Sequence, residues 1–110
     1  SQIGKLNKLI KKKKEKYIEL KKFFQNHKYL RVKEIPKGTK SNYWLINLEV
    51  DKKINVNFLL KQLNSNGIYA RQAWCLLHQL EHFKNYPKAS LENTRKLFTN
   101  IITIPSSVRL

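Results

Sequence analysis

Residues 67–78 read GIYARQAWCLLH, from Gly67 to His78. Asn66 and Gly67 are typical of a helix stop, because Gly readily adopts the left-handed backbone that follows a last helical turn. The β-branched and aromatic residues that come next predict a strand over residues 68–74. A short amphipathic segment is expected over residues 76–83. The stretch therefore predicts a helix, a strand and then a turn into a segment that bears aromatic and histidine side chains.

Two elements are predicted before this stretch. Residues 43–50, YWLINLEV, form the clearest strand, because aromatic and β-branched residues alternate roughly with polar ones. Asn55 is a suitable N-cap for a helix that runs to Asn66 and carries Phe58 and several leucines on its apolar side. An earlier strand over residues 29–35 is expected to end at the turn signal Pro36-Lys37-Gly38.

The N-terminal part predicts one long helix over residues 3–26, because apolar side chains recur there at spacings of three, four and seven. Residues 11–16, KKKKEK, interrupt this stripe for almost two turns. We expect this stretch to be solvated and the helix to be anchored at both of its ends.

After the central stretch, Ser90 is expected to cap a short helix over residues 91–98, and residues 100–104 to form a last strand. The chain of 110 residues is long enough for one domain. The expected fold class is α/β (α+β), with a small sheet and helices packed on one side. The single domain spans residues 1–110, with a long helix at 3–26 and a small α/β unit at 29–110.

The formal charge of +16 is concentrated near the N-terminus, where residues 1–40 carry 14 Lys or Arg against three acids. Such a surface attracts nucleic acid or another polyanion. Nineteen of the 23 basic residues are lysines, however, whereas phosphate-reading surfaces usually recruit Arg as well. The aromatic residues near the basic helix fall largely on its apolar stripe, and no nucleic-acid-binding motif occurs. A free-standing basic module that binds nucleic acid or another polyanion is kept as the alternative function.

No enzyme site emerges from the metal-ligating and nucleophilic residues. His78 and His82 are four residues apart, but the order H-Q-L-E-H lacks the H-E-x-x-H pattern of a zinc protease. Cys75 lies among apolar neighbours, which predicts a buried and inert thiol. The sequence thus indicates no metal site and no catalytic residue. No apolar run is long enough for a membrane span, and a cytoplasmic setting is expected.

Several motifs, in order, resemble one family along the whole chain. The family begins its last third with a helix like residues 2–10, QIGKLNKLI, and continues with a strand like residues 41–46, SNYWLI. A helix ending in L-x-x-x-G-I is similar to residues 63–68, LNSNGI. The family run R-x-x-W-x-P-L-H is similar to residues 71–78, RQAWCLLH, and its closing Leu-Pro-Ser-Ser/Gly to residues 104–107, IPSS. The chain therefore resembles the C-terminal part of the DegT/DnrJ/EryC1/StrS sugar aminotransferases.

This resemblance implies the small C-terminal domain of an aspartate-aminotransferase-like (fold type I) enzyme that uses pyridoxal phosphate (PLP). The family transfers an amino group, usually from glutamate, to a keto-sugar on a nucleotide, and its members are homodimers. The parent of this chain is expected to be a homodimer that serves the synthesis of lipopolysaccharide or another surface glycan. Its Schiff-base lysine and cofactor-binding residues lie in a large N-terminal domain whose motifs do not occur here. The chain alone is therefore expected to bind no cofactor and to be inactive.

Three residues fall in the segment that resembles the wall of the family's substrate cleft: Arg71, Trp74 and His78. The resemblance implies that Arg71 or His78 contacts the nucleotide-sugar or the donor carboxylate. The structural alternative places Arg71 in a surface ion pair, Trp74 in the core and His78 at a helix cap. Tyr43 and Trp44 are expected in the core. Leu76 replaces the family's Pro, which puts the turn before His78 in question.

Overall fold

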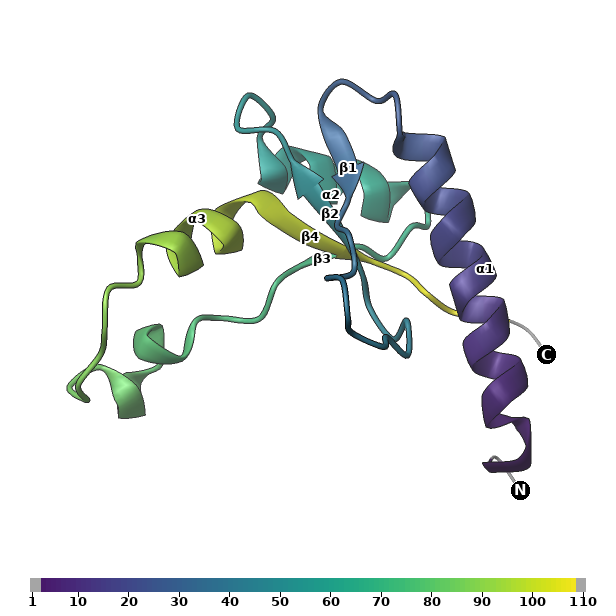
Figure 1. The fold of residues 1–110 in the computed structure, drawn as a ribbon. Helices are drawn as coiled ribbons and strands as arrows, with labels where there is room; N and C mark the ends of the chain where they lie inside the picture. Colours follow the sequence, from purple (N-terminus) through teal and green to yellow (C-terminus); the bar gives the residue numbers. More distant parts are fainter. Residues whose placement is uncertain (1–2, 109–110) are drawn as a thin grey trace.

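The computed structural model describes residues 3–108, and Figure 1 shows their arrangement. Gln2, which opens the motif quoted for the first helix, lies outside the described residues. The order of helices and strands follows the order expected from the sequence. The elements are α1 (Leu6–Phe24), β1 (Leu30–Val32), β2 (Ile46–Val50), α2 (Val56–Ser65), β3 (Arg71–Gln72), α3 (Glu92–Asn100) and β4 (Ile101–Ile104), with single 3-10 turns at Ile3–Lys5, Leu77–Gln79 and Glu81–Phe83.

The four strands form one antiparallel sheet in the order β1-β2-β4-β3. Leu48 of β2 lies opposite Val32 of β1 on one side and opposite Ile102 of β4 on the other. Since side chains alternate along a strand, this register places all three on one face of the sheet. That face is the centre of the core, which consists of Val32, Ile46, Leu48, Val50, Ala70, Ile102 and Ile104.

Helices α1 and α2 cover this apolar face. Tyr17, Leu20 and Phe24 of α1 pack against the core, as do Leu59, Leu60 and Leu63 of α2. Both sets recur at helical spacing, so one stripe of each helix meets the sheet. The expectation of a small mixed α/β fold, with helices on one side of the sheet and a long first helix, is confirmed.

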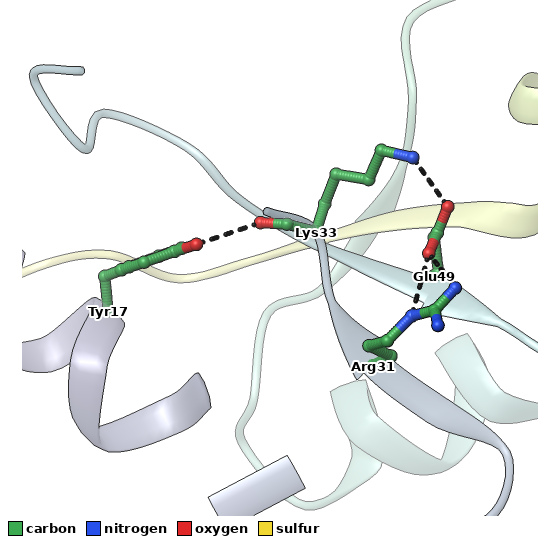
Figure 2. Close-up of polar contacts among 4 residues, drawn as sticks. All are labelled: Tyr17, Arg31, Lys33 and Glu49. Carbon is green, nitrogen blue, oxygen red and sulfur yellow. Dashed lines mark hydrogen bonds and ion pairs between the residues drawn. The ribbon is translucent and has the colours of Figure 1, made fainter. Parts of the chain in front are cut away.

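The opposite face of β1 and β2 is polar. There the carboxylate of Glu49 on β2 pairs with two basic side chains from β1 and the residue that follows it. Figure 2 shows Glu49 between Arg31 and Lys33, with nitrogen–oxygen distances of 2.8 and 2.7 Å. The hydroxyl of Tyr17 donates to the carbonyl oxygen of Lys33 at 3.2 Å, which ties α1 to the end of β1. The hydrogen bonds from Lys33 and then Arg31 hold the pKa of Glu49 below its usual value near 4.5.

We expect Glu49→Gln to reduce stability at pH 7 by about 1 kcal/mol, the upper range for partly exposed ion pairs. A carboxyl group whose pKa is lowered by folding stabilises the protein fully above its unfolded pKa, and this contribution is lost as the pH falls through the lower folded pKa. The stability difference between the variant and the parent should therefore be smaller at pH 3 than at pH 7 in urea titrations. Glu81→Gln, in an exposed turn, serves as the control. An equal loss for Glu49→Gln at pH 3 and pH 7 would contradict this role.

Helix α1 is anchored differently from the expectation. Its N-terminal end is exposed, since Ile3 and Leu6 retain 82% and 51% of their accessible surface. The lysine stretch in its middle is not wholly solvated, because Lys13 and Lys16 are half-buried and reach the C-terminal segment. The lysine stems extend along the surface while their ammonium groups donate to backbone carbonyls. The expectation of anchors at both ends and a free middle is therefore wrong.

Three predicted strands are clearly shorter than expected, and the first of them, predicted over residues 29–35, contains only Leu30–Val32. Tyr43 has a φ of 55°, a left-handed backbone that cannot continue a strand, so β2 begins only at Ile46. In the segment expected as a strand over 68–74, a tight turn joins the Ala70 N–H to the Ile68 carbonyl oxygen at 2.6 Å. Only Arg71 and Gln72 then pair with β4 at the edge of the sheet.

The predicted ends of α2 are confirmed, whereas the predicted cap of α3 is wrong. The Asn55 side chain accepts the N–H of Phe58 at 3.0 Å, and Gly67 ends α2 with a φ of 79°, both as expected. Ser90 does not cap α3. That helix begins at Glu92 after Leu91, and no side chain caps it, so the serine lies one residue too early.

The segment between β3 and α3 projects from the sheet as an arm, defined here as residues 73–91 (Figure 1). The amphipathic helix expected at residues 76–83 is present only as two 3-10 turns. The arm contributes to a radius of gyration of 16.2 Å, compared with about 13 Å for a compact domain of this length. Within the described part of the chain, no helix is both long and apolar enough to cross a bilayer.

Candidate functional site

Arg71 lies on β3, at the edge of the sheet, directly opposite Thr103 of β4. The Thr103 hydroxyl donates to Asn47 Oδ1 of β2 at 3.0 Å, and Thr103 is buried. These residues occupy one rung across β2, β4 and β3, on the face away from the core. Arg71 is exposed at the end of this rung, so its guanidinium group is held by a rigid strand and is open to a ligand.

A hollow of about 570 Å³ opens beside Arg71. Its volume is within the range of small-molecule sites, about 300–1,000 Å³. Its lining comes from β3 and the residues just before it, β4, the C-terminal segment after β4, the segment before β2, and single residues of α1 and α2. The hollow is lined by Lys13, Trp44, Leu45, Asn64, Tyr69, Ala70, Arg71, Thr103, Ile104, Pro105, Ser106 and Ser107.

Trp44 lines this hollow, and Trp74 at the start of the arm lies against Trp44 without lining the hollow in the described structure. The rings of Trp44 and Trp74 lie edge to face with their centroids 6.2 Å apart. They retain 57% and 69% of their accessible surface, so both expectations of core packing are wrong. Tyr69, another lining residue, is 78% exposed. The hollow thus combines a guanidinium group with aromatic faces, which are the groups that bind phosphates or carboxylates and that stack on rings.

Ser106 of the closing IPSS motif joins three segments beside the hollow. Its hydroxyl donates to the Trp44 carbonyl oxygen, and Lys13 Nζ donates to its Oγ at 2.9 Å and to its carbonyl oxygen at 3.0 Å. Ser106 is buried, so these bonds are sheltered from water. The motif therefore fixes the backbone that carries Trp44 and attaches it to α1.

His78 is not brought to this hollow. It is half-buried in the first 3-10 turn of the arm and does not line the hollow around Arg71 in the described structure. Leu76 precedes that turn with φ −66° and ψ 132°, the backbone that proline would impose. Leu76 thus has a backbone conformation that Pro could also adopt, and His78 belongs to the arm rather than to the lining of the hollow in the described structure.

Of the residues that line the hollow, sequence reasoning identified Arg71 but missed Lys13, Trp44 and Tyr69; Trp74 only touches Trp44. Lys13 lies 58 residues and Trp44 27 residues before Arg71 in the sequence, so only the fold brings them together. Cys75 is exposed rather than buried, because its apolar neighbours belong to the arm. Among residues 3–108, no three His, Cys, Asp or Glu side chains converge as a metal site would require.

The residues of this hollow do not fit PLP. That cofactor requires a lysine for its Schiff base and a carboxylate for its pyridine nitrogen. Lys13 is the one lysine among the described residues that line the hollow, and both of its hydrogen bonds hold Ser106. The same lining contains neither Asp nor Glu. The hollow can therefore bind and orient a ligand but supplies no residue for the transfer itself.

Comparisons with known proteins agree with this arrangement. The model of the DegT/DnrJ/EryC1/StrS aminotransferase family matches residues 1–110. The structure is similar to Helicobacter pylori PseC, an aminotransferase involved in the biosynthesis of pseudoaminic acid, with a TM-score of 0.86 and 20% identity over 100% of this chain and 31% of that one. It is also similar to DesI, solved with its TDP-sugar product, with a TM-score of 0.84 and 17% identity over 94% and 27% of the two chains.

A third similar structure is the aminotransferase TlmJ from Streptoalloteichus hindustanus, with a TM-score of 0.82 and 17% identity over 94% of this chain and 28% of that one. The search of curated protein sequences returned no match. The chain therefore spans about 30% of the length of the solved aminotransferases that it resembles.

Proposed function

Because the chain belongs to the DegT/DnrJ/EryC1/StrS aminotransferase family, we propose that it is the C-terminal small domain of a PLP-dependent nucleotide-sugar aminotransferase. The parent enzyme would move an amino group from glutamate to a keto-sugar used in surface-glycan synthesis such as that of lipopolysaccharide. In this proposal the chain forms one wall of the substrate cleft, while the remaining two thirds of the protein hold the cofactor.

The observation that carries this proposal is the hollow beside Arg71. A nucleotide-sugar presents a diphosphate, a base and a sugar ring. Arg71 offers two parallel N–H donors for phosphate or for the carboxylate of the amino donor. Trp44 and Trp74 offer exposed ring faces against which a base or sugar can lie. His78 lies outside this hollow, so its contact with substrate would depend on movement of the arm.

The arm carries exposed apolar side chains that favour a contact surface for the large domain of the parent enzyme. Beyond Trp74, its large apolar side chains retain 40–64% of their accessible surface, and a large exposed apolar patch usually marks an interaction surface. We propose that the large domain covers them in a cytoplasmic, homodimeric parent. The side chains concerned are Leu77, Leu80, Phe83 and Tyr86.

Arg71→Ala in the intact enzyme is the test of this function. We expect kcat/KM for the nucleotide-sugar to fall about 10- to 100-fold, because a hydrogen bond to a charged group contributes about 1.5–3 kcal/mol. Arg71→Lys should recover part of the loss, since it keeps the charge but not the planar pair of donors. Steady-state kinetics with varied sugar and varied glutamate would show which substrate loses affinity.

The control is Arg95→Ala, an exposed arginine on α3 that does not line this hollow in the described structure. It removes the same charge and should leave kcat/KM unchanged. If Arg71→Ala and Arg95→Ala behaved alike for both substrates, the assignment of the hollow to the substrate cleft would be wrong.

A further inference from the structure

A second hollow, of about 730 Å³, lies away from the Arg71 site and shares no lining residue with it. It is formed where α1 ends, where β2 turns towards α2 and where α3 enters β4. The residues that line it are Phe24, Gln25, His27, Lys28, Tyr29, Leu30, Arg31, Glu49, Val50, Asp51, Lys52, Lys53, Lys96, Leu97, Asn100 and Ile101.

The lining of this hollow is cationic. It contains five Lys or Arg residues and two acids, Glu49 and Asp51. Glu49 is already paired with Arg31 and with Lys33, which lies outside the lining. The Asp51 side chain accepts the backbone N–H of Lys53 at 2.9 Å and so shapes the turn. Within residues 3–108, no ion pair engages Lys28, Lys52 or Lys53.

The hollow is also lined by the imidazole of His27, whose position is held by two hydrogen bonds, and by several apolar side chains. His27 Nδ1 accepts the N–H groups of Tyr29 at 3.2 Å and Leu30 at 3.0 Å. In the neutral imidazole the proton is therefore on Nε2, which remains a donor. Phe24, Leu30, Val50, Leu97 and Ile101 supply apolar surface to the same lining.

From these features we propose that this hollow is a binding site for a nucleoside diphosphate, separate from the substrate cleft. Lys28, Lys52 and Lys53 would bind the two phosphates as point charges, and the apolar side would receive the base. The volume is within the range of small-ligand sites. The combination of a cationic turn and an apolar wall favours a nucleotide over inorganic phosphate alone.

The test uses calorimetry on the 110-residue chain carrying Arg71→Ala, which removes the guanidinium group from the other hollow, with two probes, UDP and inorganic pyrophosphate. We expect UDP to bind at least about fivefold more tightly, because base contact with aromatic or apolar side chains adds about 1–3 kcal/mol. The double variant Lys52→Gln/Lys53→Gln should weaken both probes about tenfold or more, as two charge-assisted contacts are lost. Both lysines are exposed in a turn, so the variant should fold, which circular dichroism would check.

The matched control is Lys37→Gln/Lys40→Gln, which removes the same charge from an exposed loop outside the hollow. It should leave both affinities within about twofold, because screened surface charges contribute little at a distance. Backbone amide shifts on addition of UDP should centre on residues 27–31 and 51–53. Equal weakening by the two double variants, equal affinity of the two probes, or shifts centred on the lysines of α1 or on residues 69–71 would each overturn the proposal.

Discussion

Ile102→Ala is expected to lower the free energy of unfolding by about 2–5 kcal/mol, the cost of removing a large aliphatic side chain from a packed core. Ile102 has no accessible surface and lies on β4 between Leu48 of β2 and Gln72 of β3. A domain of this size is stabilised by only about 5–15 kcal/mol, so the loss is a large part of the total. Urea denaturation followed by circular dichroism would measure it.

Ile3→Ala is the matched control for this substitution. It deletes the same atoms from a side chain that is 82% exposed at the start of the first helix. We expect a change within about 0.5 kcal/mol, as for most surface substitutions. Similar losses for the two variants would show that β4 is not at the centre of the core, and the sheet order described here would be wrong.

Local sequence signals predicted much of this fold because they are decided within a few residues. The cap at Asn55 and the stop at Gly67 depend on side-chain and backbone properties at those positions alone. The alternation in β2 likewise marks Ile46, Leu48 and Val50 as one buried face. Helix α2 was therefore placed correctly, and the buried face of β2 was identified although the strand begins three residues later than predicted.

The errors arose where long-range contacts decide the outcome. β3 is short because only Arg71 and Gln72 find a partner in β4, which local β-propensity does not reveal. Trp44 and Cys75 look like core residues by composition but are exposed. The anchoring of α1 through Lys13 depends on Ser106, 93 residues away.

Only the part of the candidate site that lies in one continuous stretch of sequence could be predicted. Arg71 and Trp74 belong to one continuous motif, RQAWCLLH, so the resemblance to the family identified them together. Trp44 and Lys13 come from other elements, and only folding brings them to the same hollow. His78 belongs to the motif but follows the arm away from that hollow.

The isolated chain is expected to have no aminotransferase activity. The hollow beside Arg71 lacks a carboxylate among its described lining residues, and its lysine is bound to Ser106. On α1, the ion pair with Glu34 raises the pKa of Lys21, which disfavours the free amine that a Schiff base requires. Surface lysines should therefore react with PLP only weakly and at many positions.

The most direct test is to incubate the purified chain with PLP, reduce it with borohydride and map the labelled lysines by mass spectrometry. Amino transfer from glutamate to a nucleotide-linked keto-sugar would be assayed in parallel. The chain should show scattered labelling well below one cofactor per molecule and no transfer. Labelling of one lysine at one cofactor per chain, together with glutamate-dependent transfer, would contradict the assignment of the chemistry to the missing domain.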